Sequence, residues 1–326
     1  MSDPASRPPL DPDATRFLMK LNAAGLRPID LIPLAQARVQ ASATVVSADA
    51  VGSVRDESIP RAHGAVGLRI YRPQTAETVI PAIVFFHGGG WVFGSLDSHD
   101  GLCRRLCRIT ECAVISVDYR LAPEHPFPAA VEDAEQAVAW VAAHAAELDV
   151  DPDRIVVCGD SAGANLATVA ALRLRDRVTL AAQVLWYPVT SFETDTNSYQ
   201  ENQEGFFLSR SDMQWFMKQY LKNPRDGEHP DAAPLSAPDL RGSPPTYLLT
   251  AGYDPLRDHG RAYAQRLIAA AVTVHFTELD GLIHGFMRRL DDFSAANRVI
   301  DDVTGFLQGI FRGVNRAQGS LHSEPR

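Results

Sequence analysis

A serine in the setting of a catalytic nucleophile lies at position 161. It stands at the centre of Gly159-Asp160-Ser161-Ala162-Gly163, between the apolar run 154–158 and the helix-forming run 164–172. A Gly-x-Ser-x-Gly sequence between a strand and a helix is typical of the sharp turn that holds a reactive serine above a sheet. The two glycines leave room where the strand and the helix approach each other. Alone, the motif also fits an ordinary turn with a helix-capping serine, so the rest of the chain must decide.

A serine nucleophile needs a base and an acid that orients the base. The candidate base is His284, in the loop after the last expected strand, and the candidate acid is Asp254, directly after the expected strand 247–250. The order Ser, Asp, His along the chain is that of α/β-hydrolases. The three residues follow different strands, whose carboxyl ends meet at one edge of an open α/β sheet. Their joint placement predicts a triad.

A glycine-rich loop supplies the fourth part of such a site. It reads His87-Gly88-Gly89-Gly90 and follows the apolar strand expected at 79–86. Glycines let a backbone come close to a substrate with its N–H groups uncovered. Two of these N–H groups, with that of Ala162, are expected to stabilise the oxyanion that forms at the substrate carbonyl. A phosphate-binding loop is the rival interpretation, but no Gly-Lys-Ser or Gly-Lys-Thr follows.

Strands and helices alternate along most of the chain. A hairpin-like pair at 54–61 and 66–71 comes first, and buried strands at 79–86, 113–117, 154–158, 180–186, 247–250 and 272–277 then alternate with helices. This alternation predicts an α/β fold with a mostly parallel sheet covered on both faces. The expected catalytic core comprises residues 51–189 and 236–313, and the polar residues 314–326 are expected to form a disordered tail.

Two segments interrupt this pattern and are expected to form one helical cap. Residues 1–50 are the first part, and residues 190–235, inserted between two core strands, are the second. The insertion is rich in aromatic side chains, which favours the roof of a pocket over an ordinary surface helix pair. Phe207 and Trp215 of the insertion, with Trp91 beside the glycine-rich loop, are the predicted substrate-binding residues.

Composition excludes several classes of partner. The 31 Lys and Arg against 40 Asp and Glu give a net charge of −9, which argues against nucleic acids and anionic membranes. We find no apolar run of membrane-spanning length and no secretory signal, so a cytoplasmic location is expected. The cysteines at 103, 107, 112 and 158 fit no common zinc pattern, so we expect buried thiols and no metal site.

Five motifs together identify a family. They are His87-Gly88-Gly89-Gly90-Trp91, Tyr119-Arg120-Leu121-Ala122-Pro123-Glu124-His125-Pro126-Phe127-Pro128-Ala129-Ala130, Gly159-Asp160-Ser161-Ala162-Gly163, Asp254-Pro255-Leu256-Arg257-Asp258 and His284-Gly285-Phe286. With them, the chain resembles the hormone-sensitive-lipase group of α/β-hydrolases, the bacterial family IV esterases, over about residues 50–312. One departure is His259, where the family usually has an acidic residue.

The resemblance implies an α/β-hydrolase fold with an eight-stranded sheet, a helical cap, and hydrolysis of carboxylic esters without a cofactor. It implies Ser161 as nucleophile, Asp254 as acid and His284 as base. It places the oxyanion donors on Gly89, Gly90 and Ala162. The expected partner is a small ester with a short or medium acyl chain. The resemblance also implies that a homodimer could form, since the strand 272–277 is expected to lie at an exposed edge of the sheet.

Two other functions remain open for this motif set. An amidase or peptidase could use the same triad, although amides have poorer leaving groups and no added domain is seen that would hold a peptide. A non-catalytic small-molecule receptor is known on this fold, but such receptors lose the triad histidine, and His284 is present here.

Overall fold

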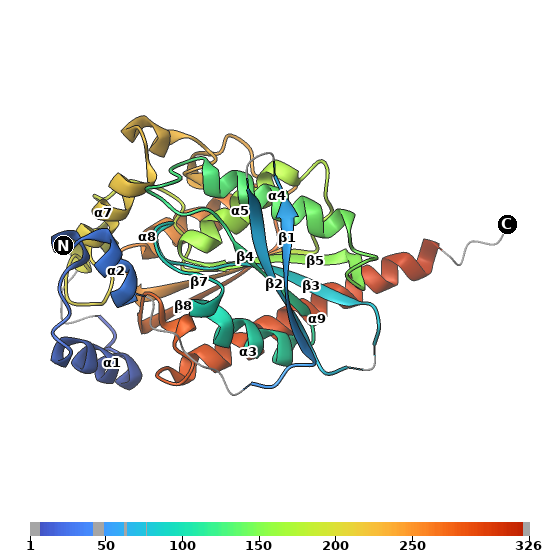
Figure 1. Cartoon of the computed structure of the whole chain (residues 1–326), viewed down its shortest axis with the longest axis horizontal. Helices are drawn as coiled ribbons and strands as arrows, with labels where there is room; N and C mark the ends of the chain where they lie inside the picture. Colours follow the sequence, from blue (N-terminus) through green and yellow to red (C-terminus); the bar gives the residue numbers. More distant parts are fainter. Residues whose placement is uncertain (1–6, 42–48, 62–63, 76, 322–326) are drawn as a thin grey trace.

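An eight-stranded, mostly parallel sheet runs through the centre of the computed structural model, which describes residues 7–41, 49–61, 64–75 and 77–321 (Figure 1). The strand order is β1-β2-β4-β3-β5-β6-β7-β8. The strands are β1 (Ser53–Pro60), β2 (Ala65–Arg72), β3 (Ile80–Phe86), β4 (Ala113–Asp118), β5 (Val150–Asp160), β6 (Ala182–Trp186), β7 (Thr246–Tyr253) and β8 (Val274–Ile283). Strand β2 pairs antiparallel with β1 and β4, and the other neighbours are parallel. The predicted fold class is confirmed.

Both faces of the sheet are apolar and covered by helices. In β3, Val84 and Phe86 pack into the core on one face, and Ile83 and Phe85 pack into the core on the other, as alternation along a strand requires. The first face is covered by α4 (Ala129–Ala143), α5 (Ala162–Leu174) and α8 (Arg257–Ala269), and the second by α3 (Asp100–Thr110) and α9 (Ser294–Leu321). Figure 1 shows α4 and α5 on the side opposite α3 and α9.

Two groups of helices lie outside these layers, in the two expected cap segments. The first comprises α1 (Pro12–Ala23), η2 (Ile29–Leu31) and α2 (Leu34–Ala41), and the second α6 (Asn197–Glu201), α7 (Arg210–Tyr220), η4 (Pro224–Glu228) and η5 (Pro234–Ser236). Helix α7 packs against η2, and the ring of Phe17 in α1 meets that of Phe207 at 5.7 Å. In Figure 1, α1, α2 and α7 lie at the same end of the molecule. The division into a two-part cap and a core stays a prediction, which these contacts support.

The C-terminal helix is longer than the sequence suggested. Helix α9 continues to Leu321, whereas we expected a disordered tail over residues 314–326. No proline interrupts the chain between 294 and 321, so nothing forces the helix to stop near Phe311. The last part of the expected tail, residues 322–326, lies outside the described residues.

The four cysteines are buried free thiols. Burial raises the pKa of Cys107 and of Cys112 to about 12, so neither carries a reactive thiolate near neutral pH. No cluster of three metal-ligating side chains occurs in the described part of the chain. None of the helices in the described ranges combines the length and apolar character that a bilayer crossing requires.

Candidate active site

Ser161 occupies a strained turn between β5 and α5. Its backbone has φ 57° and ψ −120°, in the region that residues with a side chain rarely adopt. The turn is held because the Ser161 N–H donates to the carbonyl of Trp186 at 2.9 Å and the Asn165 N–H donates to the carbonyl of Ser161 at 3.1 Å. A Cβ on Gly163 would overlap the carbonyl oxygen of Phe86, so helix α5 can start this close to β3 only with glycine there.

The three predicted triad residues form one chain of hydrogen bonds. His284 Nε2 lies 2.9 Å from Ser161 Oγ, and His284 Nδ1 lies 2.6 Å from Asp254 Oδ2. They come from the carboxyl ends of β5, β7 and β8, as the sequence predicted. Asp254 has no exposed surface, and Ser161 and His284 are 7% and 6% exposed. Such a chain is the geometry in which a histidine can take the proton of a serine hydroxyl.

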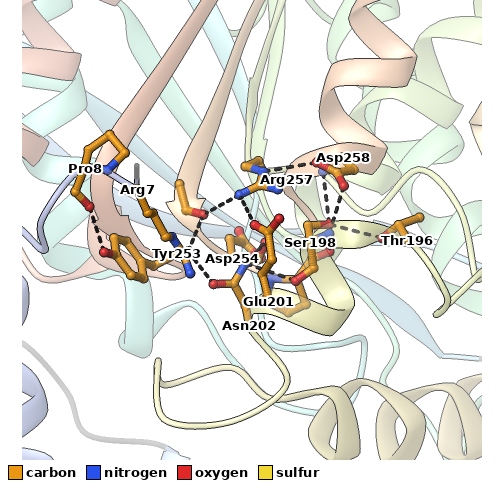
Figure 2. Close-up of polar contacts among 12 residues, drawn as sticks. Arg7, Pro8, Thr196, Ser198, Glu201, Asn202, Tyr253, Asp254, Arg257 and Asp258 are labelled. Carbon is orange, nitrogen blue, oxygen red and sulfur yellow. Dashed lines mark hydrogen bonds and ion pairs between the residues drawn. The ribbon is translucent and has the colours of Figure 1, made fainter. Parts of the chain in front are cut away.

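Asp254 is fixed on both its side chain and its backbone. Its second oxygen, Oδ1, accepts the N–H of Leu256 at 2.8 Å. Its backbone carbonyl accepts a hydrogen bond of 3.1 Å from the amide of Asn202, which follows α6 of the insertion (Figure 2). Both carboxylate oxygens therefore have one N–H or ring-nitrogen partner each, and the loop is joined to the insertion.

Asp258, the second aspartate of the acid motif, does not cap helix α8, although an aspartate near the start of a helix usually caps it. The N-cap of α8 is Leu256, and Asp258 lies in the first turn of the helix. Its Oδ2 accepts the backbone N–H of Ser198 at 2.8 Å, and its Oδ1 lies 3.0 Å from Nε of Arg257 (Figure 2). The carboxylate therefore holds the start of α6 instead of the start of its own helix.

His259 is buried, in keeping with its departure from the family pattern. It is 2% exposed, its ring lies 5.4 Å from that of Tyr199, and neither ring nitrogen has a hydrogen-bond partner among the described residues. Burial lowers the pKa of His259 to about 4, so the ring is neutral near pH 7. A neutral ring cannot replace the charge of a carboxylate. At the start of α8 the contacts with Ser198 and Arg257 are made by the carboxylate of Asp258.

The glycine-rich loop is fixed by buried polar residues. The N–H of Gly88 donates to Oδ1 of Asp160 at 2.8 Å, and Nε2 of His99 lies 3.4 Å from the same oxygen. Burial acts to raise the pKa of Asp160, but His99 and the Gly88 N–H outweigh it and hold this pKa below its ordinary value. The ring of His87 stacks on that of Tyr119 at 4.3 Å, and the hydroxyl of Tyr119 donates to the His87 carbonyl at 2.7 Å.

The three expected oxyanion donors lie around this loop and the start of α5. The carbonyl of Gly89 accepts the N–H of Phe93 at 2.8 Å, which closes the loop, while the N–H groups of Gly89 and Gly90 donate no backbone hydrogen bond within the described residues. Ala162 is the first residue of α5, where an N–H has no acceptor inside the helix. All three N–H groups are therefore available to a ligand, and their role as oxyanion hole stays a prediction.

Two of the predicted substrate-binding residues lie beside loops of the site, Phe207 next to the loop of His284 and Trp215 next to the segment that follows the glycine-rich loop. Phe207 is 38% exposed, and its ring packs against Gly285, the neighbour of His284. Trp215 is half-buried, with its ring 5.5 Å from that of Phe93 at the end of the glycine-rich loop. Substrate contact by either residue stays a prediction.

Trp91, the third predicted substrate-binding residue, is part of the packing. Its indole has no exposed surface and stacks on Tyr220 of α7 at 4.1 Å with an angle of 4°. The ring thus joins the glycine-rich loop to the insertion, and a substrate could reach it only if this stack opened. A tryptophan beside a glycine-rich loop looks the same in a sequence whether its ring faces a ligand or a neighbouring helix.

Two further residues lie at the site: Tyr187, which the sequence analysis missed, and Phe216, which was expected only as one of the aromatic residues of the insertion. Tyr187 follows β6, and its ring lies 4.6 Å from that of His284. Phe216 in α7 lies so close to Gly90 that a Cβ on that glycine would overlap its ring. The carboxyl end of the expected strand 180–186 could have indicated Tyr187, whereas Phe216 was one of several aromatics in the insertion.

Two cavities lie away from the triad. One of about 340 Å³ lies between α1 and residues 290–297, and one of about 290 Å³ lies beside α9 and Leu279 of β8. Neither is lined by Ser161, Asp254 or His284. The candidate active site is therefore assigned from the hydrogen-bonded side chains of the triad and not from the size of a cavity.

Comparison with known proteins gives one consistent answer. Residues 83–288 match a protein family described as having the alpha/beta hydrolase fold. The chain is 35% identical to carboxylesterase NlhH of Mycobacterium tuberculosis, over 99% of this chain and 100% of that protein. It is 45% identical to the carboxylic ester hydrolase LipN of the same organism, over 72% of this chain and 64% of that protein.

Solved structures agree with this assignment. An ester hydrolase from the metagenome of Lake Arreo, solved with a derivative of bipyridine phosphonate, superposes with a TM-score of 0.88 at 36% identity and covers 93% of this chain and 99% of that one. The chain therefore belongs to the α/β-hydrolase family, in the hormone-sensitive-lipase group of carboxylesterases.

Proposed function

We propose that this chain hydrolyses carboxylic esters through an acyl-enzyme formed on Ser161. The observation that carries the proposal is the hydrogen-bonded chain from Ser161 Oγ through both nitrogens of His284 to Asp254 Oδ2, with distances of 2.9 and 2.6 Å. The names of the relatives, carboxylesterase and carboxylic ester hydrolase, support the same reaction class.

The first half of the reaction acylates the serine. His284 Nε2 takes the hydroxyl proton of Ser161 as Oγ attacks the ester carbonyl. Asp254, held on Nδ1, keeps the ring in the tautomer that leaves Nε2 free to accept, and stabilises the positive charge that the ring acquires. The tetrahedral intermediate collapses when His284 returns this proton to the leaving alkoxide, and the alcohol departs. Water then repeats the sequence on the acyl-enzyme and releases the acid.

Backbone N–H groups stabilise the negative charge that develops on the carbonyl oxygen of the substrate. We assign Gly89, Gly90 and Ala162 to this role because their N–H groups lie next to the nucleophile or in the fixed glycine-rich loop. The Gly88–Asp160 hydrogen bond of 2.8 Å holds that loop before substrate arrives, so little reorganisation is needed in the transition state. Removal of one such donor costs about 3 kcal/mol in comparable sites.

The substrate class follows from the residues around the triad. We assign residues 1–50 and 190–235 to a cap over the site, which presents aromatic side chains such as Phe207 and Trp215 to a short or medium acyl chain. Each buried methylene is worth about 0.8 kcal/mol, so two further methylenes add roughly 1.6 kcal/mol, or about fifteenfold in kcat/KM. This gain ends when the chain fills the pocket, and the resemblance to the hormone-sensitive-lipase group implies a maximum at about four to eight acyl carbons.

A series of p-nitrophenyl esters tests the substrate class. Activity measured below the solubility limit of each ester should rise from acetate to a maximum at about four to eight carbons, and a covalent serine inhibitor should abolish it. Activity that rises steadily to palmitate and jumps at a lipid–water interface would identify a true lipase. A matching p-nitroanilide separates the amidase alternative, which requires turnover of the anilide comparable to that of the ester.

We also propose a location in the cell and an oligomeric state for the protein. A cytoplasmic location is supported by four cysteines that remain free thiols, as is usual in a reducing compartment. A homodimer is supported by β8, which lies at one edge of the sheet. Light scattering on the purified protein measures its mass, and a monomer at micromolar concentration would contradict the dimer.

A further inference from the structure

The N-terminal segment 7–11 joins the ends of β7 and β8, the two strands that lead to the acid and the base. We propose that Arg7, in this segment, is a positioning residue that holds Asp254 against His284. This inference rests on the proposed function, because it concerns the same triad. Arg7 precedes α1, far in sequence from both strands, and no motif in the sequence pointed to it.

Arg7 makes two hydrogen bonds beside the acid (Figure 2). Its Nη2 donates to the carbonyl of Gly252 at 2.9 Å and to Oδ1 of Asn202 at 2.6 Å. The amide nitrogen of the same Asn202 donates to the carbonyl of Asp254 at 3.1 Å. Arg7 therefore holds the main chain at Gly252, two residues before the acid, and is also linked to the backbone of Asp254 through the side chain of Asn202.

The tyrosine between Gly252 and Asp254 is held as well. The guanidinium carbon of Arg7 lies 3.5 Å from the ring centroid of Tyr253, a cation–π contact. The hydroxyl of Tyr253 donates to the carbonyl of Pro8 at 2.7 Å (Figure 2). Each of the residues 252, 253 and 254 thus has a contact with the segment or with Asn202.

The same segment also contacts the end of β8, which leads to the base. The N–H of Asp11 donates to the carbonyl of Gly281 at 2.8 Å, three residues before His284. A Cβ on Gly281 would lie 3.0 Å from both the nitrogen of Asp11 and the carbonyl oxygen of Pro9, so the two backbones touch. The segment therefore connects the end of β7 with the end of β8.

This connection lies where the strands themselves are irregular. The parallel pairing of β7 and β8 shifts register between Ala251 and Tyr253, immediately before Asp254. The regular ladder therefore does not determine the spacing of the two loops by itself. A displacement of about 1 Å can cost about 100-fold in rate when it separates catalytic groups. The hydrogen bonds of segment 7–11 supply the constraint that the ladder lacks there.

The test is a set of substitutions at Arg7 measured with a short-chain p-nitrophenyl ester. Arg7→Met should lower kcat by about 10- to 100-fold with little change in KM. Arg7→Lys, which keeps a cation over Tyr253 and one donor, should recover part of the loss. Arg16→Met is the matched control, because Arg16 lies in the same N-terminal region, is exposed, and forms an ion pair with Asp13, which is not part of the triad; it should keep wild-type kcat.

A double-mutant cycle distinguishes positioning from a general loss of structure. If Arg7 acts through Asp254, Arg7→Met should have little further effect on a chain that already carries Asp254→Asn. Should Arg7→Met fail to fold, Asn202→Ser removes the link from the other side and must show the same dependence. An unchanged kcat, an equal loss in both backgrounds, or a change confined to KM overturns the proposal.

A proton spectrum tests the inference without a substrate. The strongly downfield resonance of the proton between His284 Nδ1 and Asp254 should be lost or broadened in Arg7→Met and kept in Arg16→Met. If wild-type protein hydrolyses no ester, the proposed function fails, and this resonance still decides on Arg7. An identical resonance in Arg7→Met and wild type would contradict the proposed positioning.

Discussion

Replacing Asp254 by asparagine tests whether Asp254 or the nearby Asp258 is the acid that orients His284. Asp254 accepts from two donors at once, since Oδ2 lies 2.6 Å from His284 Nδ1 and Oδ1 accepts the Leu256 N–H at 2.8 Å. An asparagine side chain has only one acceptor oxygen for these two positions. If its oxygen faces Leu256, its NH2 faces Nδ1, which must then accept. The proton moves to Nε2, and His284 can no longer act as base for Ser161.

The expected cost is large and selective. The wrong tautomer lowers kcat by about 10⁴-fold, or about 5.5 kcal/mol of transition-state stabilisation. Asp258→Asn is the matched control, because Asp258 lies four residues further on and pairs with Ser198 and Arg257 instead of with His284. It should keep kcat and lower the free energy of unfolding by about 1–2 kcal/mol.

Steady-state kinetics with p-nitrophenyl butyrate and urea unfolding of both variants measure these effects. Circular dichroism of Asp254→Asn should match that of the wild type, because the change is nearly isosteric. If Asp258→Asn lost activity and Asp254→Asn kept it, the acid would be Asp258 and the assignment of the triad would be refuted.

Three further predictions follow from the site. Ser161→Ala and His284→Ala should each abolish nearly all turnover, and the double variant should lose little more, because the two act as one unit; losses that multiply would show independent roles. Gly90→Ala should lower kcat by about 100-fold, because the added Cβ enters the ring of Phe216 at a position with φ +60°, and steady-state kinetics would contradict this if kcat were unchanged. Burial lowers the pKa of His259 from 6.5 to about 4 in the folded chain. Between pH 6.5 and 4 the unfolded chain therefore binds more protons than the folded one, and up to about 3 kcal/mol of the free energy of unfolding is lost as the pH falls through this range. Chemical unfolding at several pH values should show a smaller loss in His259→Gln, and an equal loss would mean that other groups are responsible.

Strands of the core and the triad were predictable because their signals are local. Strand β3 is a continuous apolar run, and Ser161 lies in a turn whose glycines are required by close contact. The positions of Asp254 and His284 followed from a rule of topology, that the carboxyl ends of parallel strands share one edge. Each strand and each motif depends on a few residues that are adjacent in sequence, and the topology rule brings the motifs together.

Features that depend on packing between distant segments have no signal in the local sequence. Trp91 stacks on Tyr220, more than one hundred residues later in the chain, so its burial has no local signal. Sequence alone favours Asp258 as a helix cap, because an aspartate near a helix start usually caps it; here its partner is the N–H of Ser198, about sixty residues earlier in the chain. The contacts of Arg7 with the acid loop likewise span more than 190 residues of sequence.

Labelling with a p-nitrophenyl phosphonate tests the central claim, that Ser161 is the nucleophile. The phosphonate should inactivate the protein in one-to-one stoichiometry with release of p-nitrophenol, and mass spectrometry of its peptides should find the added group on Ser161. Ser161→Ala should release no p-nitrophenol and stay unlabelled, and His284→Ala should react far more slowly. A label on any other residue, or full ester hydrolysis by protein that carries the label on Ser161, would contradict the account.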